Sequence, residues 1–77
     1  MYIIYRKYYF NGEEKIEYYM HCIEQHAKYS RLIRYATRFN SKEDAAIVTK
    51  HLRTLDFNPD IDIGEVKLGD NNANTII

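Results

Sequence analysis

The sequence predicts an α+β fold: a small antiparallel sheet that opens with an N-terminal hairpin and carries one helix packed on one face, in the order β-β-β-α-β. Three observations predict it. Asn11-Gly12 separates two runs of aromatic and β-branched residues, residues 42–55 have apolar side chains at helical spacing, and residues 61–68 have the composition of a short closing strand. One helix and one sheet need a single core.

The N-terminal hairpin follows from its turn. Asn-Gly is the preferred pair for a type I′ turn, which needs a positive φ at both central residues. A two-residue loop places Phe10 opposite Glu13 and continues the pairing to Arg6 with Glu17, Tyr5 with Tyr18 and Ile3 with Met20. Alternate side chains point to opposite faces, so the hairpin carries tyrosines on both.

The helix is predicted over residues 42–55. Ser41 followed by Asp44 resembles a capping box, and acidic residues in the first turn favour the positive end of the helix dipole. The apolar stripe consists of Ala45, Val48, Leu52 and Leu55. Asn58-Pro59-Asp60 is typical of a turn that ends the helix before the closing strand.

Residues 24–39 allow two interpretations. Strand spacing places Ile33, Tyr35, Thr37 and Phe39 on one face, whereas helical spacing groups Leu32 with Tyr35 or Ala36 and with Phe39. We favour a loop followed by a strand at about residues 31–39, because Asn40-Ser41 then connects this strand to the helix.

Composition places the chain among single-domain globular proteins. The 77 residues are 45% hydrophobic and 29% charged, and 11 basic residues balance 11 acidic ones. We expect one domain over residues 1–69 and a polar, flexible tail over residues 70–77. The single Cys22 allows no intramolecular disulfide, and no apolar run is long enough to cross a bilayer, so a cytoplasmic location without membrane contact is expected.

One helix can cover only one face of the sheet. We expect the apolar stripe to pack on the side of Ile3, Tyr5, Tyr18 and Met20, which leaves the other face without a cover. An exposed apolar patch rich in tyrosine is typical of an interface. The predicted anchors for a second copy of the chain or for another protein are Tyr2, Ile4, Tyr8, Phe10 and Tyr19. The alternative is a solvated face.

A second candidate contact lies in residues 26–38, where basic residues occur without any acidic one. Lys28, Arg31, Arg34 and Arg38 are interleaved with Tyr29 and Tyr35. This pattern suits phosphates and stacked bases, an acidic protein surface, or internal pairing with the acidic residues downstream. The sequence lacks the motifs of the common nucleic-acid-binding modules.

We expect no catalytic residues, no metal and no cofactor. His21 and Cys22 are adjacent, so strand geometry points them to opposite faces, and His26 and His51 do not complete a zinc-ligand spacing. Glu13-Glu14 lies at the turn and is typical of a solubilising pair. The three glycines are isolated, which excludes a phosphate-binding loop.

The opening MYIIYRKYYFNGEEKIEYY and the later RFNSKEDAAIVTKHL resemble the small orphan accessory proteins of bacteriophages of low-GC Gram-positive bacteria. The resemblance implies a non-catalytic interaction protein that binds a host or defence protein in the host cytoplasm and inhibits or redirects it. The alternatives are a small nucleic-acid-binding protein using residues 28–38, a structural part of a phage particle, and a cellular protein from a bacterium with an AT-rich genome.

Overall fold

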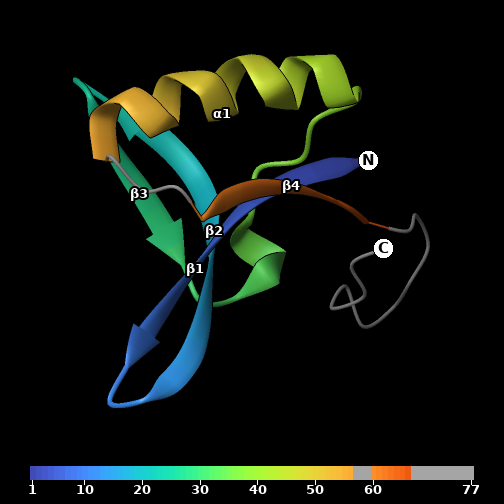
Figure 1. Cartoon of the computed structure of the whole chain (residues 1–77). Coiled ribbons are helices and arrows are strands. Elements are labelled where there is room, and N and C mark those ends of the chain that lie inside the picture. The colour runs from blue at the N-terminus through green and yellow to red at the C-terminus, as the bar shows by residue number, and fades with distance from the viewer. Residues whose placement is uncertain (57–59, 67–77) are drawn as a thin grey trace.

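The computed structural model of the chain describes residues 1–56 and 60–66, and it has the predicted α+β fold (Figure 1). The strands are β1 (Tyr2–Phe10), β2 (Glu13–Ile23), β3 (His26–Ser30) and β4 (Ile61–Glu65). They form one antiparallel sheet in the order β3-β2-β1-β4. The helix α1 (Lys42–Asp56) lies on one face, and the short 3-10 helix η1 (Ile33–Tyr35) connects β3 to it.

The first hairpin has the predicted register. Phe10 pairs with Glu13, Arg6 with Glu17, and Tyr5 with Tyr18. Asn11 has φ 55° and Gly12 has φ 80°, as a type I′ turn requires. The predicted pairing does not reach Ile3 and Met20, because residues 37–39 lie between the two strands there: Thr37 bonds to Tyr19 of β2, and Phe39 bonds to Tyr2 of β1.

The helix begins where the sequence predicts. The Asp44 N–H donates a hydrogen bond to Ser41 Oγ at 3.1 Å, which caps the helix N-terminus. Ala45 and Leu52 of the predicted stripe are fully buried, and Val48 packs against the same cluster. β4 begins at Ile61 as predicted, whereas the end of that predicted strand, the preceding Asn58-Pro59 and the tail at 70–77 lie outside the described residues.

The predicted strand at residues 31–39 is wrong. The third strand is His26–Ser30, and it follows a tight turn in which Glu24 and Gln25 have φ 50° and 68°. These residue types rarely adopt positive φ, so the sequence gives no local signal for this turn. Of residues 31–39, Phe39 forms an isolated bridge to Tyr2, and Thr37 donates a hydrogen bond to the Tyr19 carbonyl.

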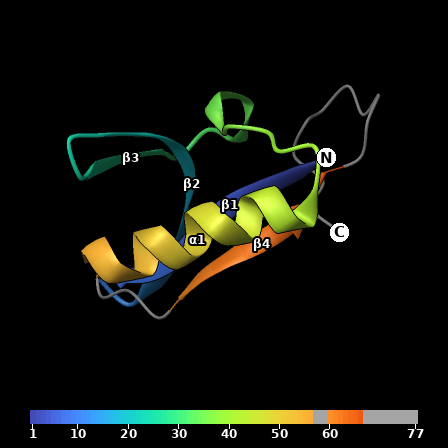
Figure 2. The same cartoon turned by 90° about the horizontal axis from the view of Figure 1, so that it is seen from above.

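The face assignment of the helix is also wrong. α1 covers the face that carries Ile4 and Tyr19, here called the helix face, and forms a core there with Ala45, Leu52 and Ile61. Figure 2, seen from above, shows α1 running along β1 and β4. The opposite face, here called the turn face, is covered by η1, with a second cluster of Ile3, Ile33, Ala36 and Val66.

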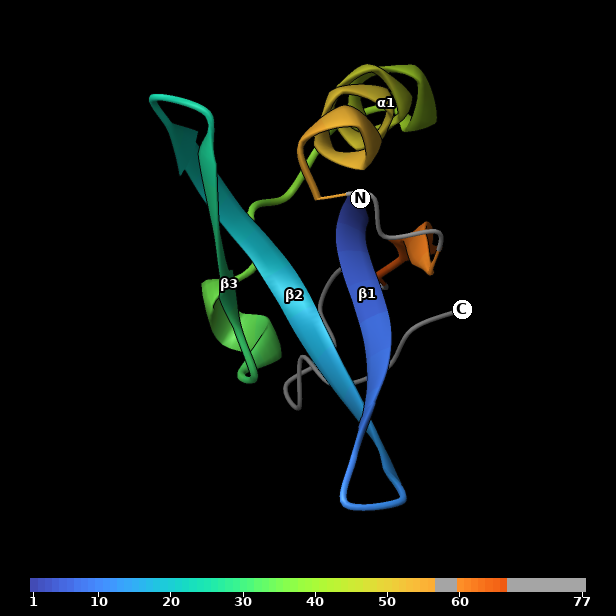
Figure 3. The ribbon, with the colours of Figure 1, turned by 60° about the vertical axis from the view of Figure 1, so that its left-hand side comes forward.

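The chain reaches the helix face by passing through the sheet. The residues of β1 before Tyr5 and those of β2 after Tyr18 no longer pair with each other (Figure 3). Residues 37–39 lie between the two strands there. The Thr37 N–H donates to the Tyr19 carbonyl at 2.9 Å, its hydroxyl donates to the Met20 carbonyl, and Phe39 exchanges two backbone hydrogen bonds with Tyr2. Because of this crossing, η1 and α1 cover opposite faces, and Tyr18 packs on the turn face while Tyr19 packs on the helix face.

Candidate functional site

The five predicted anchors divide into core and surface residues. Ile4 is completely buried and Tyr19 is only 8% exposed, while Tyr2 is half-buried against the same cluster. The Tyr19 ring lies 6.2 Å from the ring of Tyr29 in an edge-to-face arrangement and 6.4 Å from the ring of Phe39 in a stacked one. Ile4 and Tyr19 therefore belong to the core beneath α1 and are not exposed as binding anchors, whereas Tyr2 is partly exposed.

Tyr8 and Phe10 instead lie on a projecting arm. Among the residues that the structure describes, β4 pairs with β1 as far as Arg6 and β3 pairs with β2 from Tyr18 onward, so residues 8–15 pair with one another alone. We call this segment the hairpin arm. Figure 1 shows its turn at the end of the molecule opposite α1.

The hairpin arm carries three consecutive aromatic residues, here called the aromatic tip: Tyr8, Tyr9 and Phe10. Tyr9 is 72% exposed, Phe10 is 59% exposed and Tyr8 is half-buried. Tyr9 is not among the predicted anchors, because strand alternation places it on the same face as Ile3 and Tyr5, where the sequence predicts the helix to pack. The length of the first two strands relative to their neighbours is the signal that could have found it, since a long hairpin extends past short flanking strands.

An ion pair stabilises the base of the hairpin arm. Arg6 Nη2 and Nε donate to Glu17 Oε1 at 2.8 and 3.1 Å across the β1–β2 pair. The Arg6 guanidinium also lies 3.6 Å from the centroid of the Tyr29 ring, on the helix face. Arg6 thus joins β1, β2 and β3 where the four-stranded sheet ends. Toward the turn, Lys15 and Glu13 pair at 2.9 Å, and Tyr9 donates to Glu14 at 3.5 Å.

Residues 26–38, here called the basic segment, lie on a different surface from the aromatic tip. Lys28 is on β3, Arg34 is on η1, and Arg31 and Arg38 flank that short helix. All four side chains are exposed, and within residues 1–55 and 60–66 none of them pairs with a carboxylate. Leu32 and Tyr35 are exposed between them, with the Arg34 guanidinium 5.1 Å from the Tyr35 ring centroid. The internal charge pairing that the sequence allowed is absent from this part of the chain.

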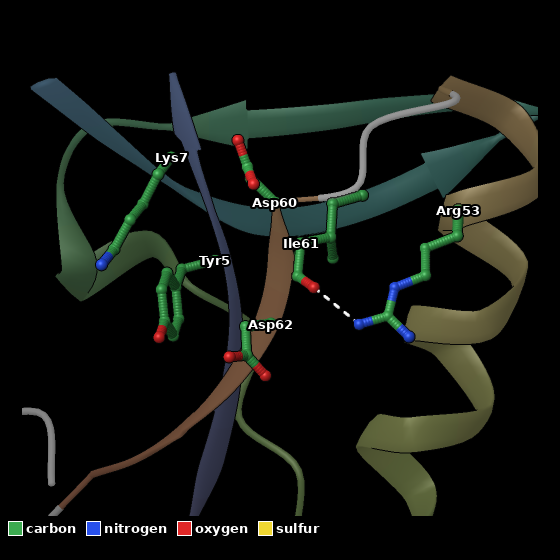
Figure 4. Close-up of a pocket in the computed structure, with 6 residues that line it drawn as sticks. All are labelled: Tyr5, Lys7, Arg53, Asp60, Ile61 and Asp62. Atoms are coloured by element: carbon green, nitrogen blue, oxygen red, sulfur yellow. Dashed lines mark hydrogen bonds between the residues drawn. The ribbon is translucent and has the colours of Figure 1, made fainter. Parts of the chain in front are cut away.

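An open pocket of about 310 Å³ lies at the start of β4 (Figure 4). Its lining residues are Tyr5, Lys7, Arg53, Asp60, Ile61 and Asp62. Arg53 Nη2 donates to the Ile61 carbonyl at 2.8 Å, so this guanidinium is held by the wall of the pocket. Two cations and two carboxylates line the same space, so the pocket selects neither an anionic nor a cationic ligand.

The residues considered for catalysis lie on different sides of β2. His21 is exposed opposite Lys28, while Cys22 pairs with Ala27 and packs against the core of the helix face. Within the described residues, no three His, Cys, Asp or Glu side chains are grouped as a metal site requires. In the same part of the chain, no helix has the length and apolar character that a bilayer span needs.

Burial raises the pKa of the Tyr18 hydroxyl above its ordinary value of 10.0. Burial and, to a smaller extent, the charge of Cys22 raise the pKa of Tyr19 as well. Both hydroxyls are therefore held in the neutral form by the folded state. They lie on opposite faces, Tyr18 against the η1 cluster and Tyr19 in the core beneath α1.

These raised pKa values predict a loss of stability in alkali. Below about pH 10 both tyrosines are neutral whether the chain is folded or not, so they add no pH dependence. Above it the unfolded chain loses protons first, and the free energy of unfolding falls as the pH rises toward the folded-state pKa. Urea unfolding at about pH 8 and pH 11 should show a smaller fall for Tyr18→Phe with Tyr19→Phe than for the wild type. Equal falls would contradict the assignment.

Comparison with known proteins adds no relative: no family model, no curated protein and no solved structure matches the chain. The two candidate functional surfaces are the aromatic tip and the basic segment.

Proposed function

We propose that the chain is a non-catalytic protein-interaction module whose aromatic tip binds a protein partner. The observation that supports this most is the exposure of Tyr9 and Phe10 on an arm that extends beyond both flanking strands. A two-stranded ribbon is only marginally stable by itself, and exposed aromatic rings on it contribute little to the core. Tyrosine is enriched among the residues that dominate binding energies, which gives these rings a role.

The base of the hairpin arm supports the same proposal. The Arg6–Glu17 pair and the contact of Arg6 with Tyr29 attach the arm to the sheet. A surface that is ordered before binding loses less conformational entropy when the complex forms. The aromatic tip is therefore presented in a fixed direction, which favours a specific partner over unspecific adhesion.

The class of partner follows from the resemblance to small phage accessory proteins. We propose a host or defence protein as the target, inhibited or redirected by occupation of its surface, and the host cytoplasm as the place of action. Self-association through the aromatic tip is the competing explanation of the same exposed rings. A size-exclusion measurement of the isolated protein separates it from the heteromeric proposal, since a dimer would elute at twice the mass.

The test compares three proteins in a nuclease-treated lysate of a low-GC Gram-positive bacterium. The tagged wild type and the control Ile47→Ser are expected to retain the same stoichiometric protein, while Tyr9→Ser with Phe10→Ser loses it by at least about tenfold, because each ring is expected to contribute about 1 kcal/mol or more. Ile47 is a matched control, because it is 70% exposed but lies on α1.

The folded state of each variant is checked by circular dichroism and urea unfolding. Retention of the same protein by the tip variant, with its fold intact, would contradict the proposed function. A retained protein that disappears equally from the Ile47→Ser sample would also contradict it, because the arm would then not be the contact.

A further inference from the structure

The two edges of the sheet differ. β3 and β4 are the outer strands, and an outer strand presents backbone N–H and C=O groups to which another chain can pair. Among the described residues, β3 has no strand on its outer side, and Figure 3 shows it at the margin of the sheet. The five residues of β3 extend over about 17 Å, enough to pair with a short extended segment.

The edge of β4 is closed by the protein's own side chains. The Lys7 N–H donates to the Asp60 carbonyl and the Val66 N–H to the Met1 carbonyl, so the backbone groups of Ile61 and Ile63 face away from β1. Arg53 donates to the outward Ile61 carbonyl at 2.8 Å, and the Asp62 carboxylate accepts from the Ile63 N–H at 2.8 Å. This arrangement opposes strand addition at β4 and leaves β3 as the candidate edge.

The charges beside β3 indicate which segment would pair there. Lys28 lies on the strand, and Arg31 and Arg34 follow it, all exposed and without a carboxylate partner among residues 1–55 and 60–66. Two copies of β3 side by side would bring like charges together, which is unfavourable across a strand pair. The occupant should therefore be a different chain, and it should be acidic.

The exposed apolar residues in the same segment favour a protein over a nucleic acid. Leu32 and Tyr35 lie between the arginines and are about half exposed. Nucleic-acid binding depends chiefly on phosphate neutralisation, to which the exposed Leu32 side chain contributes nothing. An acidic peptide with alternating apolar side chains matches both the charges and the apolar contacts.

We propose that β3 and the basic residues that follow it form a second binding surface, which takes an extended acidic protein segment as an added strand. The added segment pairs its backbone with the outer edge of β3, and its carboxylates contact Lys28, Arg31 and Arg34. This surface lies apart from the aromatic tip, so the proposal goes beyond the proposed function and holds whether or not the tip binds a partner.

The test titrates the ¹⁵N-labelled full chain with a peptide of about seven alternating glutamate and valine residues, which matches the length of an added strand. Saturable shifts should appear at the amides of residues 26–30 and not at 61–65. Arg31→Glu with Arg34→Glu should raise the dissociation constant by at least about tenfold, whereas the control Lys42→Glu with Lys50→Glu, equal in charge but located on α1, should not.

Three comparisons make the outcome decisive. The same peptide with alternate backbone nitrogens methylated keeps its charges but cannot pair as a strand, so undiminished binding of it would overturn the proposal. Stronger binding of an oligothymidine, falling steeply with salt, would also overturn it in favour of nucleic acid. Tyr9→Ser with Phe10→Ser should bind the acidic peptide as the wild type does, which separates a failure of this proposal from a failure of the aromatic tip.

Discussion

Replacing Leu52 by alanine is expected to lower the free energy of unfolding by about 2 to 5 kcal/mol. Leu52 is completely buried and joins α1 to Ile4 and Ile61 of the sheet. α1 is the only α-helix among the described residues, so the cavity has no second helix to close it. Whole domains are stable by only about 5 to 15 kcal/mol, and a chain of this size lies toward the lower limit.

Urea unfolding followed by circular dichroism measures this loss. Ile47→Ala is the matched control, because it removes a similar side chain from the same helix at a position that is 70% exposed. Its effect should be within about 0.5 kcal/mol. Similar losses for both variants would mean that α1 does not present the face described above.

Tyr19→Ala is expected to lower the free energy of unfolding by about 3 to 5 kcal/mol, as truncation of a buried aromatic side chain does. Its ring lies between those of Tyr29 and Phe39, in the core beneath α1. Truncation would also leave Phe39 without its stacked neighbour. Phe39 belongs to the segment that passes through the sheet and is held there by backbone hydrogen bonds to Tyr2.

The matched control is Tyr9→Ala. Tyr9 is in the same hairpin and is 72% exposed, so its replacement should change the stability by less than about 0.5 kcal/mol. The reverse result, a stable Tyr19→Ala and an unfolded Tyr9→Ala, would support the face assignment that the sequence alone suggested. The pair of variants therefore tests which tyrosines belong to the core.

The hairpin and the helix could be predicted because their signals are local. Asn11-Gly12 determines the turn and with it the register, and Ser41 caps a helix whose apolar stripe has a single period. Each of these features depends on residues within a few positions of one another, which is the range over which turn and capping chemistry acts.

The faces of the sheet could not be predicted, because they depend on a contact between distant segments. Both faces of the hairpin carry apolar residues, so its pattern does not indicate which one the helix covers. The choice is made by residues 37–39, which pair with β2 and β1 in turn and lead the chain from one face to the other. The positive φ angles of Glu24 and Gln25, which place β3, have no signature in those residue types.

The exposure of the candidate site residues could be predicted in part. Phe10 and the four basic side chains are exposed, as predicted. Ile4 and Tyr19 were predicted to lie on the uncovered face and are instead buried beneath α1. Alternation along a strand assigns each residue to a face of the sheet. It does not indicate how far along the strand another element packs on that face. Near the turn, no strand of residues 1–56 or 60–66 pairs with the outer side of the hairpin arm, and Tyr9 and Phe10, on opposite faces, are both exposed.

The central claim is that the aromatic tip is the contact with a protein partner, and site-specific photocrosslinking tests it most directly. Benzoylphenylalanine is placed at position 10, where Phe10 is 59% exposed and the fold should tolerate it, and at position 47 as the control. After irradiation in a low-GC Gram-positive host, position 10 should give one discrete adduct with a host protein and position 47 should give none. Adducts from position 47 alone, or none from position 10 in a folded protein, would contradict the claim.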